Sequence, residues 1–168
     1  MPMPSITLPS TRGHTVDLAL LAPGRTVIYC YPLTARPGEA LPQGWDSIPG
    51  ARGCTPQACA FRDHHRELAA LGADVFGLST QAQDYQREMA ERLHLPFPVL
   101  SDSDLRFAQE LRLPTLAIAG MTLIKRLTLI VRNGTIEHVF YPVFPPDESA
   151  TQVIRWLAAR PRLGRFDR

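Results

Sequence analysis

The run from Thr26 to Tyr31 (TVIYCY) constrains the fold of this chain more than any other segment. It is short, apolar and rich in residues that favour strands, which predicts a strand at the centre of a sheet. Such a strand is buried on both faces, so it needs a packed layer on each side. We therefore expect a sheet that lies between helices.

The patterns around this run predict the other elements. Residues 6–8 and 14–18 flank a turn at Arg12-Gly13 and indicate a hairpin. Asn133-Gly134 lies between the β-rich runs 127–131 and 135–140, which is a strong hairpin signal because both turn residues accept positive φ. After the long loop we expect one helix with Ala58, Phe61, Leu68 and Leu71 on its apolar stripe. Strands are expected at 73–78 and 97–100, with a helix between them that Ser79 or Thr80 caps. Two more helices are expected, one opened by residues 101–104 and continuing through Leu111, the other at 147–159. This order predicts an α/β, thioredoxin-like fold: a mixed β-sheet flanked by helices, with an N-terminal β-hairpin.

Length and composition indicate one globular domain. The 168 residues suffice for a single domain over 1–168, which ends in a basic tail at 160–168. The net charge of +2 does not indicate nucleic acid, and the C-terminal arginines lack interleaved aromatic residues or a recognition motif. No secretory signal or membrane-spanning run is visible, and three cysteines are too few for a secreted disulfide framework. We expect a cytoplasmic protein without a nucleic-acid or membrane partner.

The segment from Pro32 to Gly53 contains four prolines and four glycines and has no periodicity. An irregular segment of this length inside a compact domain is usually functional. It leads directly into Cys54 at the start of the predicted helix. The free N–H groups and partial positive charge of a helix N-terminus favour a thiolate, and Arg52 adds positive charge. These features predict that Cys54 is reactive.

The spacing of Cys54 and Cys59 predicts a conformational switch. In an ideal helix, residues i and i+5 lie about 7.5 Å apart along the axis and about 140° apart around it, which separates their Cα atoms by about 8.6 Å. A disulfide requires less than about 7 Å. If both residues are helical, the first turn must unwind before they can bond.

The cysteines are also compatible with other interpretations. A C-x4-C pair alone is also compatible with two inert thiols. A metal site built from Cys54, Cys59, His64 and His65 is disfavoured because the side chains do not converge on one helix face. Cys30 lies in an apolar strand and is expected in the core. We expect neither a metal nor an organic cofactor.

Residues 53–63 (GCTPQACAFRD) resemble the active-site segment of the Q-type peroxiredoxins, the bacterioferritin comigratory proteins. Residues 27–32, 75–80, 97–102 and 126–131, the last followed by Gly134, are similar to four further segments of that family in the same order. The resemblance implies a thiol peroxidase with a redox-active disulfide that acts on hydrogen peroxide or organic hydroperoxides. It also implies a thioredoxin- or glutaredoxin-like reductant, no cofactor, and a monomer or homodimer.

By the same resemblance, Cys54 is the peroxidatic cysteine and Cys59 resolves it through an intramolecular disulfide after local unfolding. Arg126 corresponds to the arginine that activates the thiolate and orients the peroxide. The family carries a Thr or Ser three residues before the peroxidatic cysteine, where this chain has Ala51. Thr34 and Thr55 are the candidates for supplying that hydroxyl.

Two alternatives remain open from the residues themselves. A thiol–disulfide oxidoreductase has the same fold, although it usually carries a C-x2-C pair at the helix start. A non-enzymatic redox sensor or partner-binding module would instead use oxidation-driven unwinding to present the Pro32–Gly53 loop to another protein.

Overall fold

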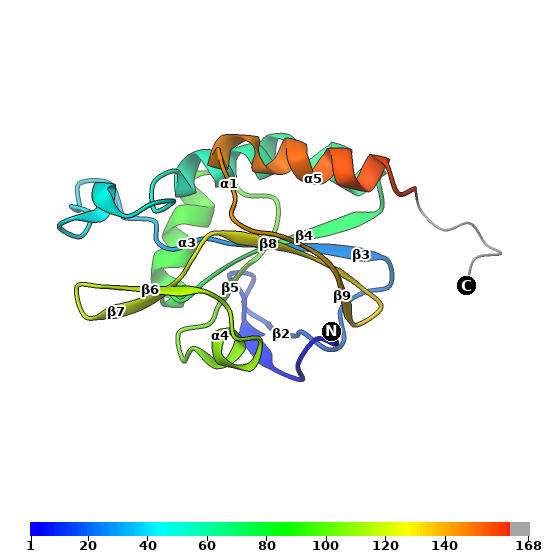
Figure 1. Cartoon of the computed structure of the whole chain (residues 1–168), viewed down its shortest axis with the longest axis horizontal. Helices are drawn as coiled ribbons and strands as arrows, with labels where there is room; N and C mark the ends of the chain where they lie inside the picture. The colour runs from blue at the N-terminus through cyan, green and yellow to red at the C-terminus, as the bar shows by residue number, and fades with distance from the viewer. Residues whose placement is uncertain (162–168) are drawn as a thin grey trace.

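The computed structural model describes residues 1–161 (Figure 1). The strands are β1 (Thr7–Pro9), β2 (Thr15–Asp17), β3 (Arg25–Cys30), β4 (Ala73–Ser79), β5 (Val99–Ser101), β6 (Thr115–Ile118), β7 (Met121–Ile124), β8 (Leu127–Arg132) and β9 (Thr135–Phe140). The α-helices are α1 (Cys54–Asp63), α2 (His65–Ala70), α3 (Gln83–Arg92), α4 (Arg106–Glu110) and α5 (Ser149–Ala158), with short 3-10 helices η1 (Trp45–Ser47) and η2 (Pro146–Glu148). Of the predicted basic tail, residues 162–168 lie outside the described part.

A five-stranded mixed sheet forms the centre of the molecule, in the order β5-β4-β3-β8-β9. As predicted, β3 is central: it pairs in parallel with β4 and antiparallel with β8. Its side chains alternate between the two faces, as strand geometry requires. Val27 and Tyr29 join the core beneath α1 and α5, whereas Ile28 and Cys30 join the core on the side of α4 and the β1–β2 hairpin (Figure 1). The predicted thioredoxin-like architecture and N-terminal hairpin are confirmed.

Three predictions about local structure were wrong or incomplete. The first helix is interrupted at His64, so the stripe from Ala58 to Leu71 is divided between α1 and α2. Neither Ser79 nor Thr80 caps α3, which begins after Ala82 without a side-chain cap from the described residues. The antiparallel pair β6–β7 was not predicted at all.

The long loop before α1 packs against the β6–β7 hairpin. Trp45 and Ala51 of the loop form a small core with Leu123 of β7, and Leu33, Ile48, Leu116 and Ile118 pack against it. This small core is separate from the two that cover the main sheet. It fixes the path of the loop beside the carboxyl ends of β3 and β4, where α/β sheets usually bind their ligands.

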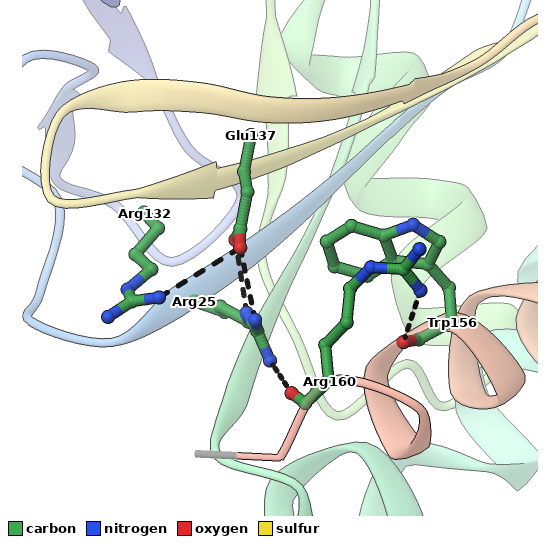
Figure 2. A network of polar contacts seen from close by, with 5 residues as sticks. All are labelled: Arg25, Arg132, Glu137, Trp156 and Arg160. Carbon is green, nitrogen blue, oxygen red and sulfur yellow. Dashed lines mark hydrogen bonds and ion pairs between the residues drawn. The ribbon is translucent and has the colours of Figure 1, made fainter. Parts of the chain in front are cut away.

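The other end of the sheet holds a polar network that fixes α5 (Figure 2). Arg25 at the start of β3 forms an ion pair with Glu137 at 3.0 Å and donates a hydrogen bond to the carbonyl of Arg160, just beyond α5. The Arg160 guanidinium lies over the Trp156 ring, 4.4 Å from its centroid. The network holds the C-terminal end of α5, while Ser149 at its N-terminal end contacts Gln57 of α1. No helix in residues 1–161 has the length and apolarity needed to cross a membrane.

Candidate active site

Cys54 is the first residue of α1 and is almost completely buried, with 6% of its surface exposed. Gly53 precedes it with a φ of 102°, and no side chain of the described residues caps the helix. The N–H groups of the first turn therefore keep their partial positive charge for the sulfur. A Cβ at Gly53 would lie 2.6 Å from Cγ of Pro146, so both the backbone conformation and the close approach of η2 require glycine.

Arg126 brings a full positive charge to the sulfur. Its side chain is buried just before β8, and Nη2 lies 3.2 Å from Sγ of Cys54. The same nitrogen is 3.3, 3.1 and 3.0 Å from the carbonyl oxygens of residues 50, 51 and 52 respectively. A guanidinium stays charged at any physiological pH. It therefore forms a stronger hydrogen bond with a thiolate anion than with a neutral thiol. The end of the long loop thus holds a fixed cation beside Cys54.

Gln57 connects this cation to the rest of the fold. It lies one turn after Cys54 and is completely buried. Its Oε1 accepts a hydrogen bond from Nη1 of Arg126 at 2.5 Å, and its Nε2 donates to Oγ of Ser149 at 3.3 Å. The amide therefore joins α1, the residue before β8, and the first residue of α5. Gln57 thus holds Nη1 of Arg126, while the loop carbonyls hold Nη2.

Cys54 lines a cavity of about 450 Å³ between the long loop and α1. Thr34 and Thr55 line the same cavity, and so do Asp46 and Arg52. Arg52 forms an exposed ion pair with Asp46 at 3.4 Å, where solvent screens both charges. That Arg52 adds positive charge near Cys54 stays a prediction; its carbonyl helps to hold Arg126, whose guanidinium contacts the sulfur.

The other two cysteines occupy different environments. All three thiols are free. Cys59 is half-buried in the same uninterrupted helix as Cys54, which is the arrangement whose ideal geometry keeps the two apart. Cys30 is completely buried on the opposite face of the sheet, and burial raises the pKa of its thiol far above the usual range. Cys30 thus belongs to the core, as predicted. Among residues 1–161, no group of three His, Cys, Asp or Glu side chains is placed to hold a metal ion.

Comparisons with known proteins show which family the chain belongs to. Residues 1–154 match the Redoxin family. The chain is 30% identical over 155 residues to chloroplastic peroxiredoxin Q of Sedum lineare, which covers 92% of this chain and 74% of that protein. The chain belongs to the peroxiredoxin Q family.

Two further relatives extend this comparison. Chloroplastic peroxiredoxin Q of Gentiana triflora is 29% identical over 155 residues, covering 92% of this chain but 64% of that protein, so this peroxiredoxin is the shorter of the two. The crystal structure of peroxidoxin BcpB from Mycobacterium tuberculosis superposes with a TM-score of 0.78 at 26% identity, covering 96% of this chain and 97% of that one. Family membership makes this chain a thiol peroxidase, an oxidoreductase that uses a peroxide and a thioredoxin-type reductant.

The structure of this peroxiredoxin brings together most of the predicted site residues. Arg126 contacts Cys54, and Thr34 and Thr55 border the same cavity, whereas Cys59 does not line it. Sequence reasoning missed Gln57. Its position three residues after Cys54 places it on the same helix face, which was the available signal.

Proposed function

We propose that Cys54 is the peroxidatic cysteine and that Arg126 activates it. The observation that carries this proposal is the distance of 3.2 Å between Nη2 of Arg126 and Sγ of Cys54 in a buried site. The Cys54 thiolate attacks one peroxide oxygen, so that an S–O bond forms as the O–O bond breaks. The sulfur is oxidised to a sulfenic acid, and the departing alkoxide or hydroxide takes a proton and leaves as alcohol or water. The Arg126 guanidinium stabilises the thiolate and the negative charge on the departing oxygen.

We propose that Cys59 resolves this sulfenic acid. Its thiol condenses with the Cys54 sulfenic acid, an S–S bond forms, and water leaves. Because both residues begin in one helix, the step requires the first turns of α1 to unwind. A thioredoxin- or glutaredoxin-like dithiol then supplies two electrons and two protons by thiol–disulfide exchange, which restores both thiols.

The test is peroxide consumption coupled to a thioredoxin system. Cys54→Ser should abolish turnover, and Cys59→Ser should allow a single oxidation of Cys54 without efficient turnover. Cys30→Ser is the matched control, because this buried thiol faces the opposite core, and it should retain the wild-type rate. Mass spectrometry of peroxide-treated protein should show a Cys54–Cys59 disulfide. Wild-type turnover by Cys54→Ser, or a disulfide that includes Cys30, would refute the assignment.

The same assays separate this proposal from the two alternatives. Reduction of insulin disulfides without peroxide turnover would indicate a thiol–disulfide oxidoreductase. A peroxide rate no faster than that of free cysteine, with redox-dependent binding of another protein, would indicate a sensor. The cytoplasmic location, the monomeric or homodimeric state and the absence of a nucleic-acid or membrane partner stay predictions from the sequence.

A further inference from the structure

Ala51 occupies the place where the family carries a hydroxyl before the peroxidatic cysteine. Its side chain is 1% exposed and packs with Trp45 and Leu123 in the small core beneath the long loop. Its carbonyl oxygen accepts from Arg126 at 3.1 Å and lies 3.8 Å from the Cys54 sulfur. Residue 51 therefore helps to hold the site through its backbone, but it offers no hydroxyl to a substrate.

Thr34 is held rigidly in the wall of the Cys54 cavity. It lies beyond the carboxyl end of β3, while Gln81 lies beyond the carboxyl end of the parallel neighbour β4. The Gln81 side-chain amide binds Thr34 at two points: Oε1 accepts from its backbone N–H at 3.0 Å, and Nε2 donates to its carbonyl at 2.9 Å. Both residues are buried. This two-point contact fixes the backbone of Thr34 and leaves only the side-chain hydroxyl uncommitted.

That hydroxyl has no hydrogen-bond partner among the described residues, although Oγ1 is buried and the residue is only 7% exposed. Buried polar groups are nearly always paired, so this hydroxyl has an unmet demand for a partner. Because other atoms of Thr34 line the cavity, a rotation about its Cα–Cβ bond brings Oγ1 to a ligand bound there. Thr55 also lines the cavity but is half-buried, and its hydroxyl is not among the buried unpaired groups.

We propose that the Thr34 hydroxyl hydrogen-bonds the peroxide in the Cys54 cavity, in place of the hydroxyl that Ala51 lacks. This inference rests on the proposed role of Cys54. As the S–O bond forms and the O–O bond breaks, the departing oxygen gains negative charge. The Thr34 O–H donates a hydrogen bond to that oxygen and stabilises it until it takes a proton from water. In this arrangement Thr34 contacts the substrate, and Arg126 stabilises the thiolate.

The deciding variants are Thr34→Val, which keeps the shape and removes the hydroxyl, and Thr34→Ser, which restores it. Thr128→Val is the matched control, because Thr128 also has a buried, unpaired hydroxyl but does not line the cavity. Oxidation of Cys54 by hydrogen peroxide is followed by stopped flow. We expect Thr34→Val to be slower by about 10- to 100-fold, Thr34→Ser to recover to within about 3-fold of wild type, and Thr128→Val to be unchanged.

Alkylation of Cys54 by iodoacetamide provides a second readout, because it needs the thiolate but no bound peroxide. Thr34→Val should alkylate within about 2-fold of the wild-type rate. The inference is overturned if Thr34→Val reacts with peroxide at the wild-type rate, if serine does not restore the rate, or if alkylation slows as much as peroxide reduction. A loss seen in Thr55→Val but not in Thr34→Val would assign the hydroxyl to Thr55 and overturn it too. Failure of the underlying function is distinct, because the wild-type protein would then show no fast reaction with peroxide.

Discussion

Replacing Gln57 with leucine tests whether the buried amide positions the arginine of the active site. Leucine has a similar volume but removes both hydrogen bonds, so a buried N–H of Arg126 and the hydroxyl of Ser149 lose their partner. A hydrogen bond from a charged donor contributes about 1.5–3 kcal/mol and a neutral one about 0.5–1.5 kcal/mol. We therefore expect Gln57→Leu to lower the free energy of unfolding by about 2–4 kcal/mol.

The same change should slow Cys54 oxidation, because Arg126 keeps its carbonyl contacts but loses the amide that fixes its other nitrogen. A misplacement of about 1 Å in a reacting group can cost about 100-fold, so we expect kcat/KM to fall by about 10- to 100-fold. Urea unfolding and stopped-flow oxidation measure the two effects. Ser149→Ala is the matched control: it removes only the neutral hydrogen bond and should cost about 1 kcal/mol with a rate within about 2-fold of wild type. Gln57→Leu reacting at the wild-type rate would refute the positioning role.

Three other perturbations have defined outcomes. Arg126→Met should slow Cys54 oxidation by about 100- to 1000-fold. Arg126→Lys should not restore the rate, because an ammonium cannot reproduce the planar contacts to the loop carbonyls. Recovery of the rate by lysine would show that the positive charge alone suffices. Gly53→Ala should lower the free energy of unfolding by about 3 kcal/mol, because alanine is strained at this positive φ and its Cβ contacts Pro146. Gly38→Ala is the control: its Cβ meets no atom within 4 Å, so it should lower the free energy of unfolding by only about 1 kcal/mol. Equal losses would contradict the role of the Pro146 contact. Because burial raises the pKa of Cys30, its thiol should stay protonated at pH 8 and escape alkylation until denaturant is added. Peptide mapping that finds Cys30 labelled in the native protein would contradict its burial.

The sequence signals that succeeded were local. The apolar run of β3 predicted a central strand, and Asn133-Gly134 predicted the β8–β9 turn, where φ is 51° and 76°. The β6–β7 turn was missed because Ala119 adopts a φ of 50° there without being one of the residues that favour it. Likewise, no sequence signal marks the interruption of the first helix at His64, because the apolar stripe continues through it.

The contacts that make the site are not local. Arg126 and Cys54 are 72 residues apart, and Gln57 and Ser149 are 92 apart, so no periodicity reports these contacts. The role of Arg126 came only from resemblance to a family, and Gln57 was missed for want of a visible partner. Similarly, Thr34 could be suggested from the missing hydroxyl at Ala51, but its clamp by Gln81 depends on the parallel pairing of β3 with β4.

The two halves of α1 are held in different ways, and this difference predicts how far the helix would unwind in the proposed resolution step. Residues 53–57 are held by polar contacts and by the packing of Gly53 against η2. Phe61, by contrast, is completely buried and stacks on Tyr29 with ring centroids 4.5 Å apart, which stabilises the fold by about 1.5–3 kcal/mol of side-chain burial. In the proposed resolution step, unwinding has to release Cys54 and the small Ala58 from the core that they share with Phe61, whereas Phe61 itself can stay in place.

The first turn of α1 affects the two chemical steps of the proposed cycle in opposite ways. The Gln57–Arg126 contact that keeps the cation beside Cys54 also holds the first turn of α1 in its helical form. In the proposed cycle, the first step needs that turn folded so that Arg126 faces the sulfur, whereas the second needs it unwound so that Cys59 can approach. Any change that weakens the contact should therefore slow sulfenic acid formation and speed its resolution. We therefore expect the strength of this one buried amide–guanidinium hydrogen bond to set the balance between reaction with peroxide and formation of the disulfide.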